Sequence, residues 1–180
     1  MTGLLDPPDG MDRLEAAARE RLDHGVYDYI AGGADAEQTV ADNLAAWSGL
    51  RLRPHVLRDV GNVSTATTLL GGEVPAPLLV APMAYHRMCH PDGEAASAAG
   101  AAAAGALYVL STQATMSVEE VAQAAPEAAR WFQVYVVRDR GWTAELVARA
   151  AETVVKLMDA LDDRLRSTAQ VLLSRVQGSV

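Results

Sequence analysis

Three short apolar runs, separated by helix-forming segments, constrain the fold of this chain more than any other feature. The runs occupy residues 77–82, 106–111 and 131–137. The first is continuously apolar, as in a strand that is buried on both faces of a sheet. An alanine-rich helix is predicted at 93–104, a capping box opens a second helix at Ser117, and a third begins at Thr143. Three βα units in succession predict a parallel sheet, in either a barrel or a doubly wound fold.

The composition narrows the possible partners and compartments. The chain has 180 residues and a net charge of −8, which argues against nucleic acid as a main partner. Cys89 is the only cysteine, so the chain forms no internal disulfide. The first ten residues lack the pattern of a signal peptide, and the apolar run at 95–110 is too short to span a bilayer. We therefore expect a cytoplasmic protein without a membrane span.

The pattern divides the chain into three parts. Residues 1–76 are expected to form an N-terminal helical extension and a hairpin at Gly71-Gly72. Residues 77–150 contain the three βα units. Residues 151–180 continue a helical repeat that starts near Glu145, which predicts one C-terminal helix of roughly 35 residues, far above the usual 11–12.

Two polar residues in the third apolar run suggest a site. Gln133 and Tyr135 are two positions apart, so on a strand they project from the same face. They could satisfy each other or the backbone inside a core, or they could face a ligand. The residues by themselves favour the first interpretation, and the second stays open.

Six stretches of the sequence, in this order and spacing, carry a resemblance to a known family. They are VYDYIAGGAD at 26–35, RLRPHVLRDV at 51–60, LLVAPMAYHRMCHPDGE at 78–94, LST at 110–112, SVEEVA at 117–122 and WFQVYVVRDRG at 131–141. Together they resemble the FMN-dependent α-hydroxy acid dehydrogenases and oxidases, the family of glycolate oxidase, lactate monooxygenase and mandelate dehydrogenase. The resemblance implies a TIM barrel with an N-terminal helical extension and an active site at the carboxyl ends of the strands. It also implies FMN as the cofactor and a small 2-hydroxy acid as the substrate.

The resemblance assigns roles to particular residues of this sequence. Tyr29 matches the tyrosine that binds the substrate carboxylate, and Tyr135 matches the catalytic-site tyrosine that contacts the substrate oxygen. Gln133 matches the glutamine at the isoalloxazine edge, and Ser111 matches a flavin-contacting serine. The backbone segment expected to lie against the flavin ring consists of Ala81, Pro82, Met83 and Ala84.

The motif His86-Arg-Met-Cys89-His90 offers another interpretation, because its spacing is one that a metal site could use. The motif follows a strand as a loop, and His90-Pro91 matches a structural piece of the family. We therefore expect no metal site here.

The sequence also departs from the family pattern. The family takes its histidine base, an arginine, a lysine and the phosphate-binding loops from the second half of the barrel. Here all four histidines precede the third strand, and the one lysine, Lys156, lies in the terminal helical run. We expect a partial TIM barrel of about three parallel βα units that lacks strands four to eight, with the ends joined near residue 152.

Two hypotheses for function follow. The first is an FMN-dependent oxidoreductase that converts a 2-hydroxy acid to a 2-oxo acid, weak or inactive alone. The alternative is a non-catalytic remnant or partner-binding fragment with no stable flavin site. In either case, unpaired sheet edges favour self-association.

Overall fold

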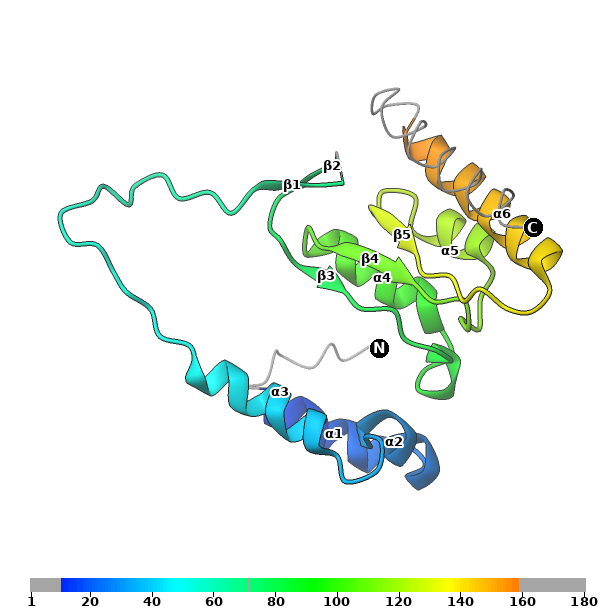
Figure 1. The fold of residues 1–180 in the computed structure, drawn as a ribbon, viewed down its shortest axis with the longest axis horizontal. Coiled ribbons are helices and arrows are strands. Elements are labelled where there is room, and N and C mark those ends of the chain that lie inside the picture. The colour runs from blue at the N-terminus through cyan, green and yellow to red at the C-terminus, as the bar shows by residue number, and fades with distance from the viewer. Residues whose placement is uncertain (1–10, 71, 159–180) are drawn as a thin grey trace, which may run out of the picture. The chain divides into compact units, whose positions relative to one another are not determined.

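The chain forms two units, Met1–Val60 and Gly61–Val180. In the computed structural model the described residues are 11–70 and 72–158. The first unit is helical, and both sheets belong to the second (Figure 1). Within the described ranges, none of the helices combines the length and the apolar character that crossing a bilayer requires. The predicted boundaries after residues 76 and 150 remain predictions.

The first unit contains three helices, α1 (Met11–Arg21), α2 (His24–Ala31) and α3 (Gln38–Gly49). One aromatic side chain joins α1 to α2. The Tyr27 hydroxyl donates a hydrogen bond to Glu15 Oε1 at 2.9 Å, and the Arg19 guanidinium carbon lies 5.5 Å from the centre of the Tyr27 ring. The predicted N-terminal helical extension is therefore present.

A short hairpin opens the second unit. Strands β1 (Thr67–Leu69) and β2 (Gly72–Val74) pair in antiparallel register, with Thr68 opposite Glu73. This hairpin matches the turn predicted at Gly71-Gly72. Val74 is buried, whereas Leu70 at the turn is exposed and has a positive φ of 47°.

The main sheet has three parallel strands in the order β3-β4-β5. The strands are β3 (Leu79–Val80), β4 (Leu107–Leu110) and β5 (Arg130–Phe132). The 3-10 turn η1 (His86–Met88) and the helix α4 (Gly93–Ala103) connect β3 to β4, and α5 (Val118–Ala124) connects β4 to β5. The helix α6 (Arg140–Met158) follows β5 (Figure 1). These are the three predicted βα units.

One face of this sheet supplies the core. Tyr108 and Leu110 alternate with Val109 along β4, so they point to the opposite face from it. They pack against small and branched side chains of the three helices, namely Ala98, Ala101, Val118, Val121 and Ala150. Right-handed crossovers place successive helices on the same face of a sheet whose strands are in sequential order. The face that carries Val109 and Trp131 is only partly buried.

The strands differ from the prediction in length and in burial. The first run was predicted to be a strand buried on both faces, but β3 has only two residues and Leu79 is 39% exposed. The third run was predicted to be a strand over 131–137, but β5 ends at Phe132. The third run is shortened because a strand extends only as far as a neighbouring strand pairs with it, and β4 ends at Leu110. The pairing of β3 with β4 stops at Val80, and β3 lies at an edge of the sheet, which leaves Leu79 exposed.

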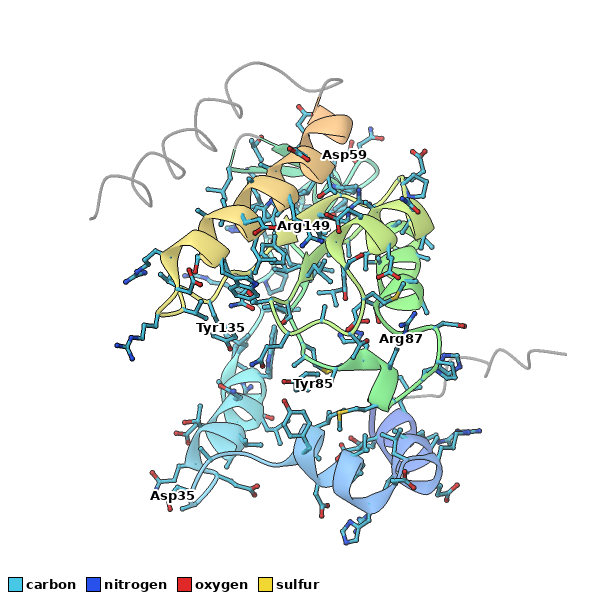
Figure 2. The ribbon with its side chains drawn as sticks, turned by 90° about the vertical axis from the view of Figure 1, so that its right-hand side faces the viewer. Asp35, Asp59, Tyr85, Arg87, Tyr135 and Arg149 are labelled. Atoms are coloured by element: carbon cyan, nitrogen blue, oxygen red, sulfur yellow. The ribbon has the colours of Figure 1, made fainter. Side chains whose placement is uncertain are left out.

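The helix α6 completes the third βα unit. It begins at Arg140, before the predicted Thr143, and it is continuous across residue 152. The part of the predicted C-terminal helix beyond residue 158 lies outside the described residues. On the side that faces α5, Arg149 forms a two-pronged ion pair with Glu119, with Nε and Nη2 each 2.8 Å from a carboxylate oxygen (Figure 2).

The core face of β4 should carry most of the stability of the second unit. Replacing Leu110, which is 2% exposed, with alanine removes buried methyl groups and leaves a cavity. We expect L110A to lower the free energy of unfolding by about 2–5 kcal/mol. The matched control is L78A, because Leu78 is 66% exposed and should cost little. Urea unfolding followed by circular dichroism measures both, and equal losses would contradict this assignment of the core.

The Glu119–Arg149 pair should give a pH-dependent contribution to stability. The hydrogen bond from Arg149 lowers the pKa of Glu119 from its usual 4.5 to about 2. A lowered pKa in the folded state stabilises the protein above the unfolded pKa, and this contribution is lost as the pH falls from about 4.5 towards 2. Because the pair is partly exposed, we expect E119Q to cost less than about 1 kcal/mol at pH 7. The difference from wild type should shrink below pH 4.5, and a constant difference from pH 7 to pH 3 would refute this assignment.

Candidate active site

Two predicted cofactor residues meet at the carboxyl edge of the main sheet. Ser111 directly follows β4 and Gln133 directly follows β5. Because β4 and β5 run parallel, their carboxyl ends lie side by side, with Leu110 paired with Phe132. Ser111 Oγ donates to Gln133 Oε1 at 3.4 Å, and the Gln133 backbone amide donates to Leu110 O at 2.8 Å. The glutamine is therefore fixed at both its backbone and its side chain.

Thr112, for which no role was predicted from the sequence, completes this arrangement. Its backbone amide donates to Gln133 Oε1 at 3.3 Å, and its hydroxyl donates to Gln133 O at 2.5 Å. The same hydroxyl accepts from the Tyr135 backbone amide at 3.0 Å. The sequence feature that could have indicated a role for Thr112 is its place in LST at 110–112, where polar side chains follow a buried strand. Thr112 thus joins the segments that follow β4 and β5.

The segment after β3 is the third part of this edge. It contains the predicted flavin-facing residues Ala81, Pro82, Met83 and Ala84, of which the first three are exposed and the last is half-buried. The next residue, Tyr85, has a left-handed backbone with φ of 58° and donates its amide to Gln113 O at 3.2 Å. Tyr85 and Tyr135 lie at the same end of the sheet, from the segments after β3 and β5 (Figure 2).

The two predicted substrate-binding tyrosines belong to different units. Tyr135 follows β5 and is 54% exposed, so its ring is accessible to a ligand at the carboxyl edge. Tyr29 lies in α2 of the first unit and is also 54% exposed. The structure brings Ser111, Gln133 and Tyr135 together through Thr112. The joint action of Tyr29 and Tyr135 on one ligand remains a prediction.

A buried carboxylate lies behind the edge. Glu94, in the first turn of α4, is fully buried and accepts three hydrogen bonds. The donors are the His86 amide at 3.3 Å, the Thr115 amide at 2.7 Å and the Thr115 hydroxyl at 2.6 Å. Burial acts to raise the pKa of Glu94, but these hydrogen bonds outweigh it and hold the pKa below its ordinary value. Glu94 therefore stays ionised at neutral pH.

The HRMCH motif does not form a metal-binding cluster. The His86 side chain is buried, and its Nδ1 lies 2.9 Å from Ser97 Oγ. The His90 Nδ1 accepts from the Asp92 amide at 3.2 Å. Burial raises the pKa of the Cys89 thiol, which disfavours the thiolate that a metal needs. Over residues 11–70 and 72–158, no three histidine, cysteine, aspartate or glutamate side chains gather to hold a metal ion.

The edge has the chemistry of a recognition surface for a flat polar ligand. The hydrogen bonds to the Gln133 side chain use Oε1, so the Nε2 amide hydrogens can donate to a carbonyl oxygen or a ring nitrogen of a ligand. Tyr135 adds a phenol that can donate or accept. The predicted site residues include no carboxylate or imidazole, so the groups that they offer to a ligand are amides and hydroxyls.

Known proteins resemble this chain over most of its length. A model of the family described as FMN-dependent dehydrogenase matches residues 18–165. Human 2-hydroxyacid oxidase 2 is 47% identical over 136 residues, which cover 76% of this chain and 39% of the human protein. Glycolate oxidase of Spinacia oleracea is 46% identical over 140 residues, which cover 78% of this chain and 38% of the plant protein.

The solved structures give the same result. A crystal structure of mandelate oxidase superimposes with a TM-score of 0.74 at 37% identity, covering 79% of this chain and 42% of that one. The chain therefore spans about two fifths of the length of the relatives it matches. Because the family model and the structural match both cover most of the chain, its three parallel βα units are part of a TIM barrel, and the chain belongs to the FMN-dependent dehydrogenase family.

Proposed function

We propose that the carboxyl edge of this sheet is the flavin-facing part of a site that oxidises a 2-hydroxy acid to a 2-oxo acid. The observation that carries the proposal is the fixed Gln133 carboxamide. Ser111 and Thr112 hold its oxygen, and Thr112 also holds its backbone. A donor fixed in this way loses little conformational entropy when a ligand binds.

The residues at this edge fit an FMN ring. A flavin presents carbonyl oxygens and ring nitrogens along its polar edge, and the Gln133 Nε2 group donates to acceptors of this kind. The backbone of Ala81–Ala84 would lie against the ring, where the small side chains of Ala81 and Ala84 allow close approach. When bound, FMN accepts the hydride that leaves the α-carbon of the substrate.

In this proposal the Tyr135 hydroxyl contacts a substrate oxygen at this edge. The role of Tyr29 as a ligand of the substrate carboxylate stays a separate expectation. A hydroxyl contact orients the substrate but leaves the proton of its α-hydroxyl group without an acceptor. The histidines of the chain are His24, His55, His86 and His90, and none follows β5. We therefore propose that the chain binds FMN but turns over 2-hydroxy acids weakly or not at all by itself.

The second candidate function is a non-catalytic, partner-binding fragment of the family. It is favoured by the partly buried sheet face that carries Val109 and Trp131, and by the exposed Leu79 on the edge strand β3. Apolar surface of this kind and an unpaired strand edge favour association with another chain. As part of this proposal, the chain associates with a second copy of itself through the unpaired edge of β3. We further propose that this takes place in the cytoplasm.

Binding of FMN tests the first candidate. We expect FMN added to the purified chain to bind with a change in its visible absorption and a quenching of its fluorescence. Replacing Gln133 with leucine removes the amide donor and should weaken binding about tenfold. The matched control is Q123L, because Gln123 is exposed on α5 and away from the edge, and its affinity should equal that of wild type. A wild-type chain that leaves the FMN spectrum unchanged would eliminate the first candidate and favour the second.

Turnover is a separate test. We expect anaerobic lactate, glycolate or mandelate to leave the absorption of the FMN-loaded chain unbleached, because no histidine lies at the β5 end to accept the substrate's hydroxyl proton. The measurement is the flavin absorbance over time at saturating substrate. Bleaching at a rate well above that of free FMN would show that another group serves as the base, and the proposal of an inactive chain would then be wrong.

A further inference from the structure

The buried carboxylate Glu94 connects two segments that both end at the candidate active site. One segment follows β3 and contains Ala81–Tyr85 and then η1, where the His86 amide donates to Glu94 Oε1. The other follows β4, where the Thr115 amide donates to the same oxygen and the Thr115 hydroxyl donates to Oε2. One side chain therefore spans the gap between the two segments.

The connection extends to a second layer of contacts. Thr115 Oγ1 also accepts from the Arg87 amide at 3.3 Å, so Thr115 meets both Glu94 and η1. Closer to the site, the Tyr85 amide donates to Gln113 O at 3.2 Å. Glu94 does not touch Tyr85 through any of these bonds, yet its partners lie close to this contact along the chain, since His86 follows Tyr85 and Thr115 is two residues after Gln113.

The surroundings of Glu94 explain why it is costly to remove. All the donors to its carboxylate are neutral groups, and the side chain is fully buried. Tyr108, which is also buried, has its pKa raised to about 12 by burial and by the charge of Glu94. The His86 ring packs edge-on against the Tyr108 ring, with centroids 6.4 Å apart. A buried charge is tolerated only where hydrogen bonds satisfy it. Conversely, loss of the carboxylate would leave the His86 and Thr115 amides without their acceptor, which is costly.

We propose that Glu94 is a positioning residue for the candidate active site, which sets the spacing between the segment after β3 and the segment after β4. The identity of the site rests on the function proposed above. In this role Glu94 touches neither cofactor nor substrate. It fixes η1 to Thr115, and this contact keeps Tyr85 against Gln113 and so places Ala81–Ala84 beside Ser111 and Thr112.

The test compares two backbone amides by hydrogen exchange on the chain without FMN. The Tyr85 amide reports on the spacing of the two segments, because its acceptor is Gln113 O. The Gln133 amide reports on the sheet, because its acceptor is Leu110 O. Replacing Glu94 with methionine keeps the length of the side chain and removes both acceptors. We expect E94M to speed exchange at Tyr85 about tenfold more than at Gln133.

Two further variants separate positioning from general stability. E94Q should restore most of the protection at Tyr85, because a carboxamide oxygen can still accept from the His86 and Thr115 amides. V121A, which opens a cavity in the core under α5, should speed exchange at Tyr85 and Gln133 by similar factors. Equal factors at both amides in E94M, or no change at Tyr85, would overturn the proposal.

A milder variant covers the case in which E94M does not fold. T115V removes the hydroxyl that Glu94 and Arg87 share but keeps the shape of the side chain, and T115S keeps the hydroxyl. We expect T115V to speed exchange at Tyr85 about threefold more than at Gln133, whereas T115S should match wild type. Identical exchange in T115V and T115S would reject the positioning role. Because no FMN is present, this result is independent of whether the chain binds a flavin.

Discussion

The parallel pairing of β4 with β5 is the interaction on which the rest of the second unit depends. It aligns Leu110 with Phe132, so the chain leaves both strands at the same level. Ser111 and Gln133 then meet without any further adjustment of the backbone. The pairing is itself maintained from one side, where Tyr108 and Leu110 are buried against α4, α5 and α6. A loss of packing on that face would therefore misalign the polar groups at the edge.

The features that the sequence predicted well are those determined by local chemistry. The capping box at Ser117 forms as expected, with reciprocal bonds to Glu120 of 3.2 Å and 2.7 Å. The alternation of apolar runs with helical segments predicted three parallel βα units, and the structure has them. The adjacency of Ser111 and Gln133 also follows from local facts, because each is the first residue after a parallel strand.

The features that the sequence did not predict depend on contacts between distant residues. The apolar run at 131–137 is strand-like along its whole length, but β5 ends at Phe132, where its partner ends. The Thr112 hydroxyl forms hydrogen bonds with Gln133 and Tyr135, which lie 21 and 23 positions further along the chain. Nothing in the local sequence marks Glu94 out, because its burial depends on the distant Thr115 and on His86, which donate to its carboxylate. The spacing of the HRMCH motif is one that a metal site could use, but spacing does not say where the side chains point. His86 points to Ser97, and His90 accepts from the Asp92 amide.

Recognition of a ligand and transfer of a proton place different demands on the groups of a site. Recognition needs fixed donors, and the hydrogen bonds among Ser111, Thr112 and Gln133 supply them from two adjacent strands alone. Proton transfer needs a base that reaches the substrate's hydroxyl group. The one histidine buried in the second unit, within its described residues, is His86, and its Nδ1 lies against Ser97 and its ring against Tyr108. A ring held in that way maintains structure, and the groups that this edge offers to a ligand are the Gln133 amide and the Tyr135 phenol.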